Sequence, residues 1–349
     1  MSEAIEADQA PGAPHPREAF GFVGHDAEEG ALADALRGER VHHAWLMTGP
    51  KGLGKATLAY RFARVLLGAR RIGPRPLDVD PSDPIARRIS ALSHGDLFVL
   101  RRTVGDRGRL RREIAAEDAR ALPGFFALAP AEGGWRVAIV DCVDDLNRHA
   151  ANALLKILEE PPPRCVLMLI CHSPGAALAT IRSRCRRIAL RPLSDEDCAR
   201  GVEAALGVAP EANVLALAHG RPGRAVALQA TRAPAMLNAV EAAVARLPKE
   251  GSGPLATIAF GREGDAQSRL DLFLDLTLDA LADGVSAAVR GAAPRHFSTL
   301  IDPANAQRWA KAWSDLSALR DQADGLGMDP AHAFVRASAI LAQAAGGRA

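Results

Sequence analysis

Short apolar runs alternate with amphipathic stretches over the first 190 or so residues of the chain. Strand-like runs that alternate with helical spacing predict a doubly wound parallel α/β sheet with right-handed crossovers. Helices are expected at Lys55–Leu67 and Asn147–Glu160, where apolar residues recur every three or four positions. Strands are expected at the apolar runs Ala44–Met47, Phe98–Leu100, Arg136–Asp141, Cys165–Ile170 and Ile188–Leu190.

The strand pattern ends near residue 192, and the remaining chain has a helical pattern. Short helices are expected over 194–206, 213–219 and 225–230, and longer ones over 235–247, 266–290, 304–326 and 330–345. The first residues are acidic and lack the apolar core of a signal sequence. The predicted organisation is a disordered lead over 1–17, an α/β domain over 18–192, a small helical domain over 193–232 and an all-α domain over 233–349.

Composition limits the partners and the compartment that can be expected. The net charge of +2 by itself argues for no polyanion partner, so any nucleic-acid contact has to come from local patches. No apolar stretch approaches the roughly 18 residues of a membrane span. The five cysteines form no C-x-x-C pair, which favours a reducing, cytoplasmic compartment with no disulfides and no zinc.

The segment Trp45–Thr57 nearly matches a phosphate-binding loop. Gly49, Gly54 and Lys55 are in register with G-x-x-x-x-G-K-[ST], and Gly52 lies between them. Glycines allow backbone N–H groups to surround a phosphate, and Lys55 supplies a positive charge at the start of the following helix. The hydroxyl that would bind Mg²⁺ is missing, because its position is Ala56 and Thr57 lies about 100° further round the helix.

A second loss occurs at the end of the strand over 136–141. Asp141 occupies the place of an acid that holds Mg²⁺ through water, but the following residue is Cys142, where a hydrolase carries the glutamate that orients the attacking water. A thiol cannot perform that role. We therefore expect Gly49, Gly52, Gly54, Lys55 and Asp141 to form a degenerate nucleotide site without efficient hydrolysis.

Two stretches are rich in arginine. Arg101–Arg112 contains six arginines that either contact phosphates or belong to a solvated hairpin leading into a helix, and the second interpretation is favoured. Arg182–Arg187 follows a short helix and contains Ser183-Arg184-Cys185. For an isolated Arg184, the simplest interpretation is a basic residue that complements a helix dipole.

Four motifs in order resemble the bacterial clamp-loader branch of the AAA+ proteins. They are the loop Gly49–Lys55, the segment 140–147 with Val-Asp-Cys-Val-Asp-Asp-Leu-Asn, the segment Ala151–Pro162, and Ser183-Arg184-Cys185. The resemblance implies an AAA+ P-loop domain, a small helical lid domain and an all-α C-terminal collar domain that oligomerises. It is strong over residues 18–192, weaker over 193–232, and rests on the helical layout beyond.

The resemblance also implies a function. Clamp loaders open the sliding clamp and place it on primed DNA, so the implied partners are the ATPase gamma/tau subunits, the delta subunit, the clamp and primer-template DNA. Arg184 would be an arginine finger, which reaches into the neighbouring subunit's ATP site. Such a finger is worth roughly 10³–10⁵ in rate. The chain would then act as a rigid stator in a hetero-oligomer for DNA replication by DNA polymerase III.

Several residues depart from the motor subunits of that branch. The region Gly68–Leu97 has no cysteine, so no zinc module is expected. Counting from Gly220, the sensor arginine position is Gly223, with Arg224 one residue late, and Cys171-His172 stands at the first sensor. No cofactor is required, although binding of ATP or ADP without hydrolysis stays open. The alternatives are an active AAA+ ATPase that uses Thr57 or water in place of the hydroxyl, and a direct DNA-binding protein.

Overall fold

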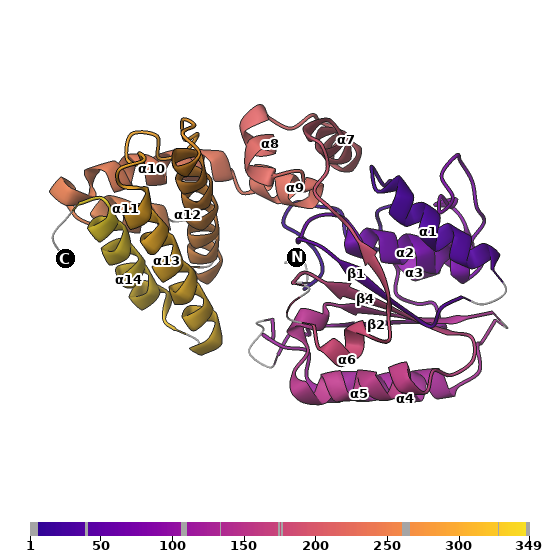
Figure 1. Cartoon of the computed structure of the whole chain (residues 1–349). Helices are drawn as coiled ribbons and strands as arrows, with labels where there is room; N and C mark the ends of the chain where they lie inside the picture. Colours follow the sequence, from indigo (N-terminus) through magenta and orange to yellow (C-terminus); the bar gives the residue numbers. More distant parts are fainter. Residues whose placement is uncertain are drawn as a thin grey trace. The chain divides into compact units, whose positions relative to one another are not determined.

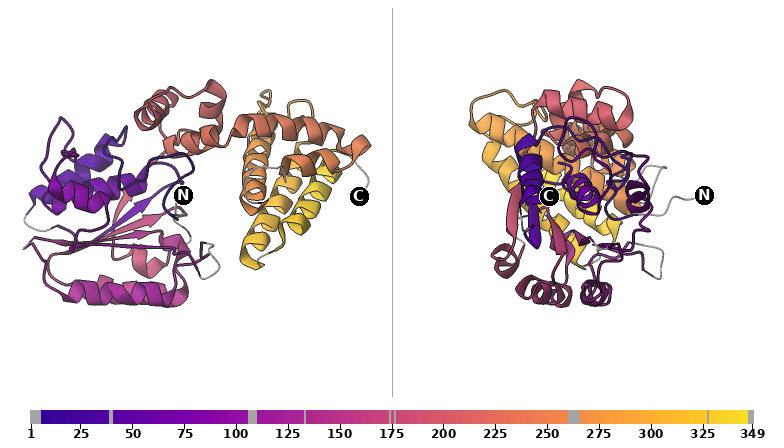
Figure 2. Two further views of the ribbon diagram at one scale, coloured as in Figure 1. Left: turned by 180° about the vertical axis from the view of Figure 1, so that it is seen from behind. Right: turned by 90° about the vertical axis from the view of Figure 1, so that its right-hand side faces the viewer.

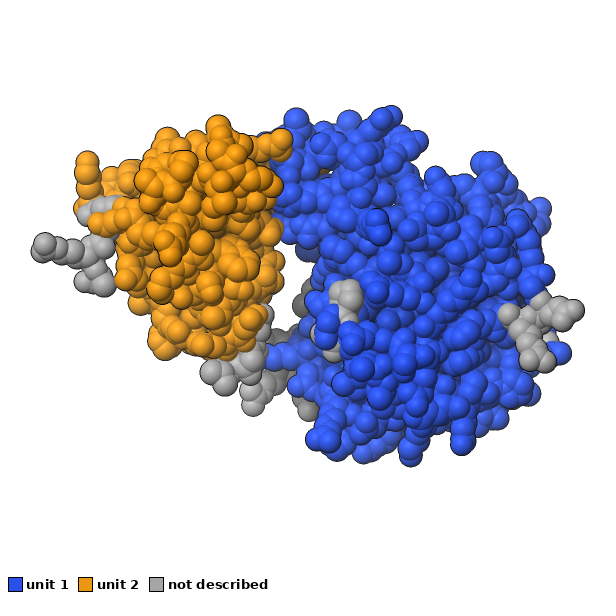
Figure 3. All heavy atoms as spheres, viewed as in Figure 1, with its two compact units in different colours: residues 1–227 blue, residues 228–349 orange. Residues whose placement is uncertain are grey.

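The computed structural model describes residues 6–38, 41–105, 110–132, 134–173, 175, 177–259, 266–326 and 328–346. It divides the chain into two compact units, residues 1–227 and 228–349 (Figure 3). The first unit contains a five-stranded parallel sheet, and the second is helical within the described residues. No helix among these residues is long and apolar enough to cross a membrane.

The sheet has the strand order β2-β3-β4-β1-β5, and every pair is parallel. Each strand agrees with a predicted one to within about two residues at either end. The doubly wound order places β1 and its loop between β4 and β5. The strands are β1 (Ala44–Thr48), β2 (Leu97–Arg101), β3 (Arg136–Asp141), β4 (Cys165–Cys171) and β5 (Arg186–Ala189).

Helices cover both faces of the sheet (Figures 1 and 2). One face packs with Trp45 and Met47 against α1, α2 and α3, and the other packs with Ala44 and Leu46 against α4, α5 and α6. Successive strand residues point to opposite faces, so fully apolar strands such as β4 serve both layers. The helices are α1 (Asp26–Arg37), α2 (Lys55–Leu66), α3 (Pro84–Ser90), α4 (Ala116–Ala127), α5 (Arg148–Glu159) and α6 (Ala179–Arg182).

Three short helices follow the sheet: α7 (Asp195–Leu206), α8 (Ala212–Ala218) and α9 (Pro222–Ala230). Ser194 caps α7 by accepting a hydrogen bond from the N–H of Asp197 at 3.1 Å. The segment is attached to the sheet domain by backbone contacts. Gly220 O accepts from Leu193 N at 2.8 Å, and a Cβ on Gly220 would meet Leu193 O at 2.2 Å.

The second unit buries large aromatic side chains between its helices. Phe273 contacts Phe334 with ring centroids 6.0 Å apart, and Phe297 contacts Trp309 at the same separation. The helices are α10 (Ala233–Glu250), α11 (Gly253–Ala259), α12 (Ala266–Val289), α13 (Ala306–Leu326) and α14 (Pro330–Ala344). Helix α11 and helix α3 were not predicted, because each has only seven residues and too few apolar positions to show a period.

Residues 6–17, predicted as part of a disordered lead, lie against the sheet domain instead. Glu6 and Asp8 pair with Arg101 at the end of β2, and Arg17 donates to Ser90 O at 2.9 Å. His15 is 2% exposed and lies 3.1 Å from the Asp8 carboxylate. The segment is held by ion pairs to a residue over ninety positions away, which an analysis of local apolar pattern cannot detect. The first five residues of the predicted disordered lead, 1–5, lie outside the described residues.

Candidate functional site

The loop between β1 and α2 has the backbone of a phosphate-binding loop. Gly49, Gly52 and Gly54 have φ values of 137°, 91° and 83°, which disfavour any residue with a Cβ. Space is restricted as well, because a Cβ on Gly49 would lie 2.4 Å from Leu190 O. The predicted strand–loop–helix arrangement is therefore present, with the loop held against the chain that follows β5.

Lys55 begins α2 as predicted, but its ammonium group is bonded to its own loop. The side chain is 3% exposed, and Nζ donates to the carbonyl oxygens of Gly49 and Pro50, the latter at 2.7 Å. Burial lowers the pKa of Lys55 to about 8, against which nearby Asp141 acts. A phosphate at this position would have to take the ammonium group from these carbonyls.

The start of α9 lies directly on the loop. Gly223 N donates to Gly52 O at 2.9 Å, and a Cβ on Gly52 would lie 2.8 Å from Arg224 N. Gly223, the residue at the predicted sensor position, therefore contacts the loop through its backbone. It has no positively charged side chain that could bind a phosphate. The small residues on both sides permit this close approach of two backbones.

Asp141 ends β3 beside Ile170 of β4, at the edge of the sheet where parallel strands present polar groups. Burial raises its pKa to about 7, and the nearby Asp8 carboxylate adds to this effect. The next residue, Cys142, is 4% exposed, and burial raises the pKa of its thiol. At pH 7 this thiol is protonated and cannot act as a base for water.

The two acids that follow are engaged elsewhere. The Asp144 carboxylate accepts hydrogen bonds from His172 N at 2.7 Å and from Ser173 N at 2.8 Å. The Asp145 carboxylate pairs with Arg102 Nε at 2.9 Å. Asp144 thus fixes the turn after β4, a structural role that the sequence did not indicate. Neither acid replaces the glutamate that Cys142 displaces.

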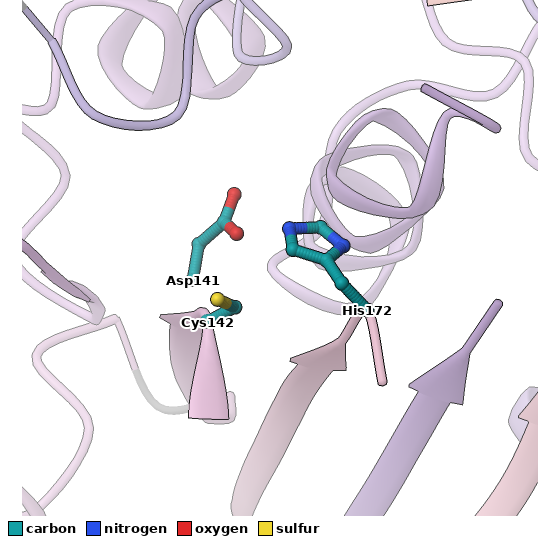
Figure 4. A group of neighbouring side chains, drawn as sticks. All are labelled: Asp141, Cys142 and His172. Atoms are coloured by element: carbon teal, nitrogen blue, oxygen red, sulfur yellow. The ribbon is translucent and has the colours of Figure 1, made fainter. Parts of the chain in front are cut away.

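His172 lies across from Asp141 and Cys142 (Figure 4). One ligand-type atom from each of the three side chains lies within 4.8 Å of the other two. Burial lowers the pKa of His172 to about 4, so its imidazole is neutral at pH 7. Its Nδ1 atom is buried and has no hydrogen-bond partner among the described residues.

These features do not fit a magnesium–nucleotide centre. Mg²⁺ requires near-octahedral oxygen ligands, and it is usually held by carboxylates, a loop hydroxyl and the phosphates themselves. At the two positions that define such a site, the chain offers Ala56 and Cys142 next to a single carboxylate, Asp141. The Lys55 ammonium group is in addition bonded to the loop.

Arg184 lies on a different face of the domain from α2. It follows α6, whose Ile181 packs in the layer with α4 and α5, whereas α2 packs against the opposite face of the sheet. The Arg184 side chain is 36% exposed, and Nη2 lies 2.9 Å from the Glu159 carboxylate at the end of α5. Nη1 donates to Thr180 O at 3.0 Å. The guanidinium is accessible and is held in one orientation.

Other arginines of the two basic stretches have internal partners. Arg101 pairs with Glu6 and Asp8, and Arg111 lies 3.3 Å from Glu117. Arg186 stacks over the Trp45 ring at 5.0 Å, and Arg187 donates to Thr48 Oγ1 at 3.2 Å. These contacts favour a structural role for the stretches, although the tip of the first one, residues 106–109, lies outside the described residues.

Comparison with known proteins agrees with this geometry. Residues 24–194 match the family model described as "DNA polymerase III, delta subunit". A curated DNA polymerase III subunit delta' from Pseudomonas aeruginosa is 37% identical over 156 residues, which are 44% of this chain and 45% of the relative. Over residues 24–194 the chain is therefore similar to subunits of DNA polymerase III.

The similar proteins also include tau and gamma subunits of DNA polymerase III. The tau subunit of Escherichia coli DNA polymerase III is 32% identical over 188 residues, 54% of this chain and 28% of that protein. A gamma subunit-related DNA polymerase III protein from Thermotoga maritima aligns at 16% identity and a TM-score of 0.47, with 91% of this chain and 99% of that one covered. The chain thus matches less than half the length of these curated relatives. The predicted α/β class, with a parallel sheet followed by a helical C-terminal region, is confirmed.

Proposed function

We propose that this chain is a delta-prime-like stator of the DNA polymerase III clamp loader. In this role it works in the cytoplasm with gamma/tau and delta subunits to load the sliding clamp on primer-template DNA. It hydrolyses no ATP efficiently itself, and it donates Arg184 to the ATP site of a neighbouring subunit. The helical second unit serves as the oligomerising collar.

The observation that carries the proposal is the contrast between the two sites. The chain's own loop lacks the metal hydroxyl and the water-orienting glutamate, and its Lys55 is bonded to Gly49 and Pro50. Arg184, by comparison, is accessible and follows the short helix α6, which packs on the other side of the sheet from α2. A guanidinium in that position can form two parallel hydrogen bonds to phosphate oxygens on another molecule.

The experiment is hydrolysis by a loader reconstituted with the full chain. Arg184→Ala should lower clamp- and DNA-stimulated ATP hydrolysis strongly, because an arginine donated in trans stabilises charge on the transferring phosphoryl group. Lys55→Ala should leave it nearly unchanged. Nucleotide retained without hydrolysis remains compatible with the proposal, and direct binding of labelled ADP to the chain measures it.

A working ATPase of the gamma/tau type is the competing function. It is favoured by the retained Lys55 and Asp141, and by the 32% identity to a tau subunit. It predicts Mg²⁺-dependent hydrolysis by the isolated chain that Lys55→Ala abolishes. The stator proposal predicts that any residual hydrolysis by the isolated chain is the same in wild type and Lys55→Ala.

A further inference from the structure

The strand edge beside the loop brings together three side chains of a kind that bind transition metals. Asp141 ends β3 and Cys142 follows it, and His172 follows β4, the strand paired with β3. Their three potential ligand atoms all lie within 4.8 Å of one another. Figure 4 shows the Asp141 carboxylate and the His172 ring pointing toward each other, with the Cys142 sulfur beneath them.

We propose that Asp141, Cys142 and His172 form a binding site for a divalent transition metal of the zinc type. This site goes beyond the proposed stator function, and it occupies the place where an active relative would hold magnesium and nucleotide. The expectation of no metal from the sequence rested on the absence of C-x-x-C pairs and of any cysteine in Gly68–Leu97. It did not consider a site assembled from two strand ends thirty residues apart.

The ligand chemistry selects the kind of metal. Thiolate, imidazole and carboxylate are the donors of protein zinc sites, whereas Mg²⁺ and Ca²⁺ take oxygen donors. Three protein ligands leave a fourth tetrahedral position for water. Zinc–ligand bonds of about 2.0–2.3 Å place ligand atoms roughly 3.5 Å apart. The ligand atoms here lie within 4.8 Å of one another, so side-chain movements of about 1 Å would bring them to the spacing that an ion requires.

Charge and rigidity support the same assignment. One carboxylate and one thiolate together neutralise a divalent ion. The occupied site would therefore add no net positive charge beside the Lys55 ammonium group, which interacts electrostatically with Asp141 and Cys142. The backbone that carries His172 is fixed by Asp144, which accepts from His172 N at 2.7 Å. Asp144 is two residues beyond Cys142, so its hydrogen bond to His172 N links the segment after β3 to the segment after β4. Hydrogen-bond partners outside the ligand set hold metal ligands in place in a similar way.

One nitrogen of the His172 ring has no competing hydrogen bond among the described residues. Nδ1 is buried without a hydrogen-bond partner among the described residues. A buried polar atom without a partner is uncommon, and a bound metal ion would supply that partner. Binding is a simple exchange: the S–H bond of Cys142 breaks, its proton goes to solvent, and a metal–sulfur bond forms without any change of oxidation state.

Cobalt titration of the full chain tests the site. The chain is stripped of metal with a chelator under reducing conditions and titrated with Co²⁺, whose bond to a thiolate gives a charge-transfer absorption. The expected result is one Co²⁺ per chain with this absorption, displaced by Zn²⁺. Cys142→Ser should remove the absorption, and His172→Ala should weaken binding by at least about tenfold, as loss of a metal-site group does.

Cys198→Ser is the matched control, because Cys198 is a buried cysteine in α7 outside the cluster, and it should bind as wild type does. No thiolate absorption in the wild type, the same absorption in Cys142→Ser, or equal loss in Cys198→Ser would each overturn the proposal. If Cys142→Ser fails to fold by circular dichroism, unchanged Co²⁺ affinity in His172→Ala overturns it instead. None of these measurements depends on hydrolysis, so the result is independent of the role of Arg184.

Discussion

In the proposed function, single residues decide which groups of a nucleotide site this chain keeps. Gly49, Gly52 and Gly54 keep the loop backbone, while Ala56 and Cys142 remove the groups that handle metal and water. All of these were visible in the sequence, because the motif fixes their spacing. The partners of the motif residues were not visible. Asp144 bonds to the turn after β4, and this depends on which strand lies beside which.

Glu159 is the clearest residue that sequence reasoning missed. Its carboxylate lies 2.9 Å from Arg184 Nη2, although the two are 25 positions apart. Both side chains are exposed, at 51% and 36%, so the pair adds little to folding stability, about 1 kcal/mol at most. In the proposed finger role of Arg184, Glu159 would compete with phosphate oxygens for the same guanidinium.

We therefore predict that Glu159→Gln lowers the ATP concentration needed for half-maximal hydrolysis in the reconstituted loader. The change should be no more than about fivefold, because the exposed ion pair contributes about 1 kcal/mol or less. Steady-state kinetics against ATP concentration gives the number. Glu160→Gln is the control at the neighbouring position. A loss of hydrolysis as deep as that of Arg184→Ala would show that Glu159 holds the arginine in its productive orientation.

At the scale of elements, the five strands and the longer helices follow from the hydrophobic pattern. The pattern is strong where an element is buried on one or both faces, as in β4 and α5. It gives no bounds for α4, the helix expected after the arginine-rich stretch, because α4 contains Pro123 and Gly124, residues that argue against a helix. It also fails for the segment 6–17, which is ordered by Arg101 through charge rather than by apolar contacts.

The double variant Glu6→Gln with Asp8→Asn should destabilise the fold by about 1–3 kcal/mol at pH 7, because Arg101 would lose its charged partners. Hydrogen bonding from Arg17 lowers the pKa of Glu6 from 4.5 to about 2. A lowered carboxyl pKa stabilises the folded state above pH 4.5, and this contribution is lost as the pH falls toward 2.

Urea unfolding across that pH range measures the effect. The deficit of the double variant should shrink as the pH falls below 4.5. Asp34→Asn is the control, because Asp34 forms an exposed pair with Arg37. A deficit no larger than that of Asp34→Asn would mean that the ion pairs of residues 6–17 do not stabilise the domain.

The contact of α9 with the loop makes a separate prediction. Gly52→Ala should cost about 2 kcal/mol or more, because φ is 91° and the new Cβ would lie 2.8 Å from Arg224 N. Gly30→Ala in α1 is the control, since its Cβ would meet nothing within 4 Å and alanine favours a helix. Denaturant unfolding compares them, and equal stability of the two variants would contradict the observed contact.

At the scale of the whole molecule, the chain consists of two compact units. The predicted boundaries at 192/193 and 232/233 remain predictions, and α10 begins at Ala233. Apolar periodicity identified helices beyond this point. It could not show which faces meet, since contacts such as Phe273 with Phe334 join residues sixty positions apart.

A fragment of residues 233–349 should fold alone, because the second unit has its own buried aromatic core. We expect a helical circular dichroism spectrum and a cooperative thermal transition. A fragment that is helical but melts without cooperativity would show that the unit needs the preceding helices to pack. This result would move the domain boundary toward the N-terminus.

The central claim is that this chain completes a neighbour's ATP site while its own site is inactive. The most direct measurement is stimulated ATP hydrolysis in the reconstituted loader with wild type, Arg184→Ala, Lys55→Ala and the control Arg182→Ala. We predict a loss of at least about 10³-fold at the neighbouring site for Arg184→Ala, the lower range for an arginine finger, and near wild-type rates for the other two. A large loss with Lys55→Ala, together with wild-type rates for Arg184→Ala, would contradict the claim.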